Sequence, residues 1–300
     1  MWNAGVTRRR THVNPPEIHH MNTLFRLTLP LFASVATLAA PSLASAADVR
    51  VTFTNVSPAG GVGTSPLWVG FHNTSFDLFD AGSAASLGVE RISEDGNTAP
   101  LTTLFAATTE SGIQGTLAGG PAFPGAVRSM DFTGLDLAGN NRWFSYASMV
   151  VLSNDFFIGN DNAMEHDLSM LLNNGGLLSF YVGGNGDVWD AGTEVNDFAN
   201  SLANGAFGIG GGQTMANQGA DEHGVVRHVD ANPYASFLSA ALVPEGYDFA
   251  PLQFTSQAAI GRIDIQLLAP VPEPDTYAML LGGLALIGAI SRRSMKRRAA

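Results

Sequence analysis

The chain contains no cysteine, and its long central part contains no lysine. The lack of cysteine excludes disulfides, thiol catalysis and thiolate metal sites, so the fold depends on its hydrophobic core and on any metal held by oxygen. From Asp48 to Pro270 there are 23 Asp and Glu residues against 6 Arg, a net charge of −17, and the other nine basic residues lie in the two ends. Such an acidic body repels nucleic-acid phosphates and anionic lipid, which excludes nucleic acid as a partner and favours cations.

The usual catalytic motifs are also missing. The body has no G-x-S-x-G element, no H-E-x-x-H pair, and no EF-hand spacing among the acids between residues 155 and 167. The glycines from Gly208 to Gly212 follow no βαβ pattern, so they indicate a loop rather than a dinucleotide site. His223 and His228 could form half of a zinc site, but a solvated acidic loop is the favoured interpretation of residues 221–228. We therefore expect no enzyme.

The N-terminal end has the three parts of a secretory signal. After Met21 come one basic residue, Arg26, an apolar run from Leu27 to Leu43, and the small cleavage sequence at residues 44–46. We expect residues 1–46 to be a signal-peptide region in which Met21 is the true start. A long basic n-region beginning at residue 1 is the alternative, and both interpretations predict export.

The C-terminal end, residues 271–300, has a different pattern. A Pro-Glu-Pro motif at residues 272–274 precedes an apolar run from Tyr277 to Ile290 and then a cluster of Arg and Lys. This order resembles a PEP-CTERM sorting signal of Gram-negative bacteria, which implies cleavage by an exosortase-type membrane protease and release to the cell surface or extracellular matrix. The apolar run predicts a transmembrane sorting helix that anchors the chain before processing, with the C-terminus cytoplasmic. Its 14 residues are few for a stable span, which takes about 20, so an ordinary anchor is the weaker alternative.

Between the two ends, residues 47–270 read as one all-β domain. The runs that predict strands are apolar, alternating or β-branched, with Gly and Pro turns between them: 48–56, 67–71, 143–152, 177–182 and 260–268. Residues 143–152 are almost uncharged and predict a central buried strand. A short helix is expected over residues 81–92, with Leu87, Val89 and Ile92 facing inward. Many short strands and little helix favour an antiparallel β-sandwich.

The stretch from Val188 to Glu194 offers the best candidate site. Asp190 and Glu194 flank a small Ala-Gly turn that can direct both carboxylates into one space. Two close carboxylates need a proton or a cation to coexist, and oxygen ligands without cysteine favour Ca²⁺ over a transition metal. Taken alone, an acidic surface turn with a packed tryptophan explains the same residues.

Four blocks in order give the body a resemblance to the spondin N-terminal domain of the F-spondin and mindin type. They are residues 66–79, residues 84–96, residues 144–159 and the Val188–Glu194 stretch. The resemblance implies a C2-like antiparallel β-sandwich with one or two short helices and a Ca²⁺ ion held by Asp155, Asp190 and Glu194. Two residues depart from the family pattern, because Asn154 replaces a proline and Glu194 replaces an aspartate.

The two resemblances together imply a function. We expect a secreted or surface-attached, non-catalytic adhesion or matrix module that is stabilised by calcium, binds an extracellular glycan or surface protein, and acts with exopolysaccharide or in a biofilm. The alternative is a secreted hydrolase of matrix polysaccharide in which Asp190 and Glu194 serve as acid and base.

Overall fold

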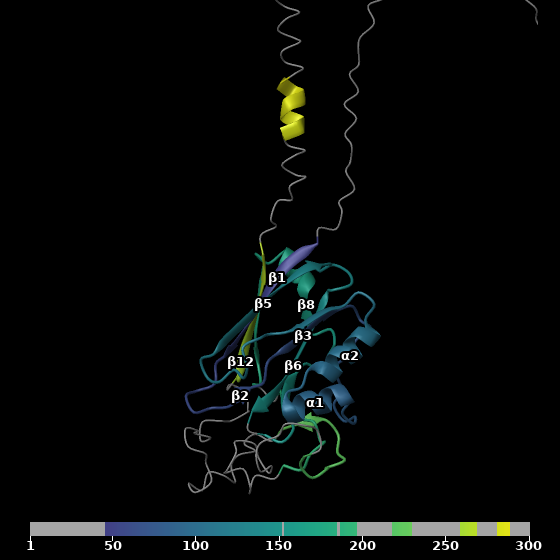
Figure 1. The fold of residues 1–300 in the computed structure, drawn as a ribbon, viewed down its shortest axis with the longest axis vertical. Helices are drawn as coiled ribbons and strands as arrows, with labels where there is room; N and C mark the ends of the chain where they lie inside the picture. Colours follow the sequence, from purple (N-terminus) through teal and green to yellow (C-terminus); the bar gives the residue numbers. More distant parts are fainter. Residues whose placement is uncertain are drawn as a thin grey trace, which may run out of the picture. The chain divides into compact units, whose positions relative to one another are not determined.

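The computed structural model describes residues 46–151, 153–184, 187–196, 218–229, 259–268 and 281–288. From residue 46 to residue 268 they form two packed sheets with two helices on the outer side of one of them (Figure 1). All strand pairs among the described residues are antiparallel, so the predicted antiparallel β-sandwich is confirmed. The N-terminal signal region up to residue 45 and the glycine-rich loop at 208–212 lie outside the described residues.

The first sheet has four strands, which have only one face on the core. Its order is β5 (Val127–Leu135), β1 (Ala47–Asn55), β12 (Gly261–Leu267) and β9 (Leu177–Val182). In β1, Val49, Val51 and Phe53 are at most 1% exposed and alternate with polar residues that face outward. This period of two is the reason these residues form a strand with one face on the core.

The second sheet contains the more deeply buried strands. Its path runs through β11 (Arg227–His228), β10 (Val188–Asp190), β7 (Phe156–Gly159), β6 (Trp143–Val151), β3 (Trp68–His72) and β4 (Ile113–Thr116). Two short strands, β2 (Gly63–Thr64) and β8 (His166–Asp167), also pair with β6. The central position of β6 and the bounds of β9 confirm the strands predicted at 143–152 and 177–182.

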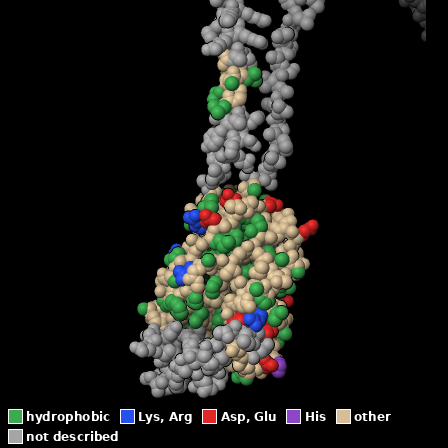
Figure 2. All heavy atoms as spheres, in the orientation of Figure 1, with side chains coloured by type: hydrophobic (Ala, Val, Ile, Leu, Met, Phe, Trp, Pro, Cys, Tyr) green, Lys and Arg blue, Asp and Glu red, His purple; other side chains and the backbone are tan. Residues whose placement is uncertain are grey.

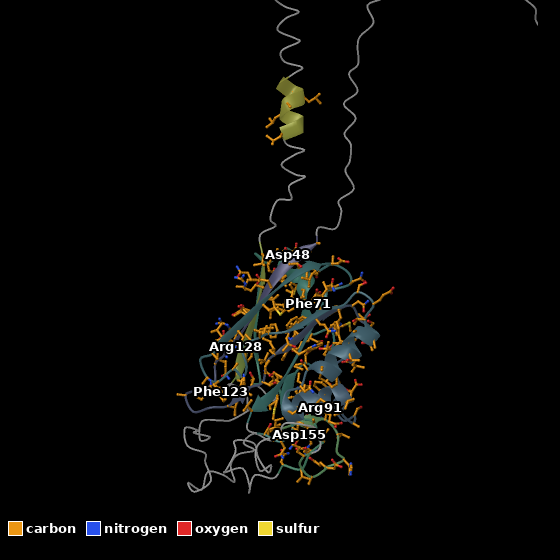
Figure 3. All side chains as sticks on the ribbon, in the orientation of Figure 1. Asp48, Phe71, Arg91, Phe123, Arg128 and Asp155 are labelled. Carbon is orange, nitrogen blue, oxygen red and sulfur yellow. The ribbon has the colours of Figure 1, made fainter. Side chains whose placement is uncertain are left out.

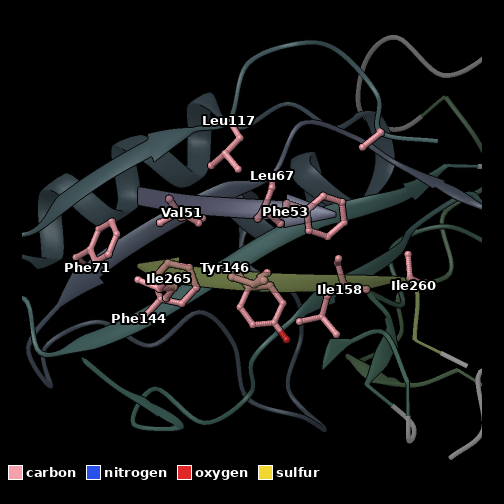
Figure 4. Packing of buried hydrophobic residues seen from close by; sticks show 14 of the residues in the cluster. Val51, Phe53, Leu67, Phe71, Leu117, Phe144, Tyr146, Ile158, Ile260 and Ile265 are labelled. Carbon is pink, nitrogen blue, oxygen red and sulfur yellow. The ribbon is translucent and has the colours of Figure 1, made fainter. Parts of the chain in front are cut away.

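Two cores hold the layers together. The first lies between the sheets, where Val51 and Phe53 of β1 share one cluster with Phe144 and Tyr146 of β6 (Figure 4). The second lies between the other face of the β3–β6–β7 sheet and the helices α1 (Leu87–Asp95) and α2 (Ala99–Thr108). Because this sheet is covered on both faces, its strands are apolar throughout rather than alternating.

The predicted helix at 81–92 is wrong at both ends. The helix α1 begins only at Leu87, because the Ser86 side chain caps it by accepting a hydrogen bond from the Val89 backbone N–H. It ends at Asp95, before Gly96 in the left-handed conformation. Val89 and Ile92 are buried as predicted, but Leu87 is 63% exposed, so its inward placement is wrong. The helix α2 and the 3₁₀ turn η1 (Leu168–Leu172) were not predicted.

Most of the C-terminal sorting signal lies outside the described residues. Within the predicted run at 277–290, residues 281–288 are helical. Among the helices that the structure describes, none is long and apolar enough to cross a membrane. Figure 2 shows Asp and Glu side chains along the top and the lower right margin of the body, with apolar and uncharged groups over the centre of this face.

Candidate metal centre

Asp155 lies in the tight turn between β6 and β7, at the end of the sandwich remote from Asp48 (Figure 3). Ser153 fixes this turn, because its Oγ donates to the Val150 carbonyl at 2.7 Å and accepts from the Phe156 N–H at 3.0 Å. Asp155 itself is 0% exposed. The turn therefore delivers a carboxylate into the protein interior rather than to solvent.

The two oxygens of Asp155 have different surroundings. Oδ2 accepts hydrogen bonds from the N–H of Thr193 at 2.8 Å, the N–H of Glu194 at 3.1 Å and the Thr193 hydroxyl at 3.2 Å. Oδ1 is buried and has no hydrogen-bond partner within the described part of the chain. Burial, followed by the negative charge of Asp190, raises the pKa of Asp155 to about 7. A cation beside this carboxylate would favour its ionised form.

Asp190 ends β10 beside this turn, where the Ala191 N–H donates to the Asp155 carbonyl at 3.1 Å. Its Oδ1 accepts from the Gly192 N–H at 2.8 Å, and its Oδ2 accepts from the Asn196 amide at 2.8 Å. Asp190 is 3% exposed, and its burial raises its pKa above the ordinary value. The predicted neighbourhood of Asp155 and Asp190 is thus present in the fold.

The third carboxylate comes from a segment that we name the strap, residues 218–229. The strap runs antiparallel to residues 188–196, with the Glu222 N–H donating to the Thr193 carbonyl at 3.0 Å and the Gly224 N–H to the Gly192 carbonyl at 2.8 Å. One oxygen each of Asp155, Asp190 and Glu222 lies within 4.8 Å of the others. Glu222 was not predicted as a site residue.

Glu194 lies next to this group but turns its side chain elsewhere. Its backbone N–H binds Asp155, whereas its Oε1 accepts a hydrogen bond from the Gly219 N–H of the strap at 2.9 Å. The residue is 0% exposed. Its role as a metal ligand stays a prediction, since the group of three close carboxylates contains Glu222 instead.

The strap also supplies positive charge. Arg227 lies 2.9 Å from Asp190 and 2.7 Å from Glu222. A lone arginine five residues after Glu222, in a body that has few basic residues, is the signal in the sequence that could have indicated this ion pair.

The two histidines of the strap have different surroundings and do not form a pair of metal ligands. The His223 side chain is 85% exposed, whereas the His228 ring stacks on Trp189 with centroids 3.9 Å apart. Val226 is 1% exposed and belongs to the core under the helices. The interpretation of residues 221–228 as a solvated loop therefore fails at Val226, which is buried, and at Arg227–His228, which form β11.

The donor set fits a hard divalent cation. The three side chains offer carboxylate oxygens, which suit Ca²⁺ or Mg²⁺ better than a soft metal. If all three carboxylates are ionised, the group together with the Arg227 guanidinium has a net charge of −2. One divalent cation would neutralise this charge. The Oδ1 of Asp155 is buried and has no hydrogen-bond partner among the described residues, so a cation bound there would offset the cost of burying it.

The fold and the site define a class: an antiparallel β-sandwich whose loops meet at a buried acidic centre. Comparison with known families gives a match of residues 50–199 to Spondin_N and of residues 270–298 to the PEP-CTERM protein-sorting motif. The chain belongs to the Spondin_N family. No curated protein matches it.

The sorting motif determines where the chain acts. It marks an exported surface protein of a Gram-negative bacterium that is processed by an exosortase-type system. The predicted resemblances to the spondin domain and to the sorting signal are both confirmed.

Proposed function

We propose that the chain is a non-catalytic module of the cell surface or extracellular matrix in which a Ca²⁺ ion joins three chain segments through Asp155, Asp190 and Glu222. The observation that carries this proposal is the Asp155 carboxylate, which is fully buried and has an unpartnered Oδ1 within the described residues. A buried carboxylate without a counter-charge is costly, and a cation removes that cost.

Calcium suits this centre better than magnesium. Ca²⁺ accepts about 6–8 oxygens in flexible arrangements, whereas Mg²⁺ demands near-ideal octahedral geometry. The candidate ligands come from three separate segments, the β6–β7 turn, β10 and the strap, and Asp155 and Asp190 are already held by backbone N–H groups. Such a set can be completed by carbonyls and water. It is poorly placed to adjust to a small ion.

The cation would act as a structural clip. The strap that carries Glu222 also carries Val226 into the core and His228 onto Trp189. An ion bound by Glu222 and by Asp155 therefore stabilises the packing of the strap on the sandwich, because binding free energy adds to folding free energy. The module would then present a rigid surface outside the cell.

The proposed partners are an extracellular glycan or a surface protein, in an exopolysaccharide or biofilm setting. Support comes from the membership of the body in the Spondin_N family and from the exosortase sorting motif. The net charge of −17 over residues 48–270 also favours a secreted, soluble body over one that lies on anionic lipid.

Burial argues against the hydrolase alternative. Asp190 is 3% exposed and Glu194 is 0% exposed, so a polysaccharide cannot reach either carboxylate without opening of the strap. The Asp190 oxygens are also occupied by Gly192, Asn196 and Arg227. An acid–base pair must lie within hydrogen-bond reach of its substrate.

The test is a calorimetric titration of the full chain with Ca²⁺ and with Mg²⁺, combined with thermal unfolding. We expect saturable Ca²⁺ binding, a raised melting temperature and weaker Mg²⁺ binding. Asp155→Asn should abolish both effects. Asp131→Asn, which alters an exposed ion pair on the first sheet, should leave both unchanged. If Ca²⁺ produced neither heat of binding nor a shift in melting temperature, the metal assignment would be wrong. If the wild type cleaved polysaccharide and Asp190→Asn did not, the hydrolase alternative would be correct.

A further inference from the structure

The strand β9 forms one edge of the first sheet. It pairs with β12 on one side, and among the described residues no strand pairs with its other side. In the register with β12, Leu178 lies opposite Ile265, and the Leu267 N–H donates to the Gly176 carbonyl at 2.7 Å. Backbone groups alternate in direction along an antiparallel strand, so those of Leu177, Ser179 and Tyr181 point away from β12. They form a row of donors and acceptors at the edge.

The opposite edge of the same sheet, β5, is protected in the usual ways. It carries Arg128 and Asp131, and its pairing with β1 is interrupted by a bulge near Ala47. Charges and bulges are the means by which natural proteins prevent edge strands from pairing with other chains. The sequence of β9, LLSFYV, has no charge and no proline, and its Leu177 and Tyr181 are 52% and 63% exposed. This edge lacks the protection that β5 has.

We propose that β9 is a self-association edge, where it pairs antiparallel with β9 of a second copy about a two-fold axis at Ser179. In this register the outward Leu177 lies opposite the partner's Tyr181, so the two exposed side chains cover each other. On the inner side Leu178 lies opposite the partner's Phe180, and both residues already pack against the core between the sheets. Leu177, Ser179 and Tyr181 are the residues whose backbone groups are directed outward, so the register also pairs donors with acceptors.

Among the surfaces of the body, the uncharged edge at β9 suits a second copy because it escapes the repulsion between like charges. The body from Asp48 to Pro270 carries a net charge of −17, so two copies repel each other over most of their surface. On β9 no side chain is charged, and the nearest acid on the same outer face, Asp264, is already bound by Arg262 and by Ser179. The side chains of β9 therefore bring no like charges together across a two-fold axis at Ser179. One strand from each copy makes a small interface, so we expect a weak, concentration-dependent dimer.

The absence of cysteine allows a direct test in the full chain. In Ser179→Cys the new thiols lie on the two-fold axis, where paired residues have Cα atoms about 5.5 Å apart, within the range for a disulfide. Mild oxidation should cross-link this variant about tenfold faster than Ser129→Cys, because pairing raises the local thiol concentration. Ser129 lies on β5, exposed on the opposite edge of the same sheet, and is the matched control. Equal rates for the two variants would overturn the proposal.

Sedimentation equilibrium gives a second, independent measurement. The wild-type mass should rise from monomer towards dimer with concentration, whereas Leu177→Lys should stay monomeric because it places a charge on the edge. The control is Val127→Lys, which changes an equally exposed residue on β5 and should behave like the wild type. The proposal is wrong if the wild type stays monomeric, which would leave β9 for a strand of another protein, or if Leu177→Lys still dimerises.

Discussion

Arg227 and Asp190 form an ion pair of 2.9 Å at the mouth of the acidic centre, and the same guanidinium binds Glu222 at 2.7 Å. The nearby carboxylates, Glu222 first, raise the pKa of Arg227, and the charge of Asp155 contributes to this effect. The protein thus supplies part of the positive charge that its own carboxylates need. A metal ion at this centre shares its ligands with an arginine.

This sharing predicts opposite effects of Arg227→Gln on stability and on metal affinity. Without Ca²⁺, loss of the guanidinium should lower the free energy of unfolding by about 1–3 kcal/mol, between the values for exposed and buried pairs. The apparent affinity for Ca²⁺ should rise, because a competing positive charge is removed. Thermal unfolding with and without Ca²⁺ measures both. Arg50→Gln, which breaks the exposed pair with Asp131, is the control and should change neither appreciably. A fall in Ca²⁺ affinity in Arg227→Gln would contradict the competition.

The identity of the third ligand gives a second prediction. Glu222→Gln should weaken Ca²⁺ binding about tenfold or more, since one carboxylate of the close group loses its charge. Glu194→Gln should change the affinity far less, because the amide oxygen can still accept the hydrogen bond from Gly219. Calorimetric titration of the two variants decides between them. The reverse order of affinities would assign the site to Glu194 instead.

Local patterns in the sequence predicted the strands well and the helices poorly. Residues 143–151 and 177–182 form strands because their apolar and β-branched side chains suit a pleated surface. This preference is local, so the two strands can be predicted without knowing any tertiary contact. In α2 only Leu101 and Phe105 are buried, so the helix has little amphipathic pattern and depends on packing against the second sheet. Its proline near the first position is consistent with a helix start but does not predict one.

The residues of the candidate site could likewise be predicted only in part from the sequence. Asp155 and Asp190 could be predicted together because the family blocks retain them, and the fold places them side by side. Glu222 could not be predicted, since it reaches the centre through backbone pairing between the strap and residues 188–196, and that pairing has no local signature in the sequence. Site residues brought together by long-range pairing require the fold to be known.

The pH dependence of stability gives a third prediction. In the folded chain the pKa of Asp155 is raised from 3.8 to about 7, so between these values the folded state holds a proton that the unfolded state releases. The contribution of this group to stability is therefore complete below pH 3.8 and is lost as the pH rises through about 7. Without Ca²⁺, the wild type should lose stability relative to Asp155→Asn by on the order of 1 kcal/mol per pH unit in this window.

Calcium should reverse this trend, because the ion binds the ionised carboxylate and displaces its proton. The stabilisation by Ca²⁺ is expected to grow from pH 5 to pH 8 in the wild type and to be absent in Asp155→Asn. Denaturant unfolding at several pH values, with and without Ca²⁺, measures both effects. Identical pH profiles for the two proteins in the absence of metal would contradict the raised pKa.

The last prediction concerns the turn between Asp190 and Glu194. Gly192 has a φ of +68°, and a Cβ there would lie 2.6 Å from backbone atoms of Val225 in the strap. Gly192→Ala should therefore displace the strap as well as strain the turn, with a loss of about 2–4 kcal/mol and weaker Ca²⁺ binding through Glu222. Gly120 is the matched control, since its φ is +71° but a Cβ there meets nothing within 4 Å. Gly120→Ala should show only the backbone strain, of about 1 kcal/mol, and unchanged Ca²⁺ affinity. If the two alanine variants bound Ca²⁺ equally well, docking of the strap would not be coupled to the metal centre.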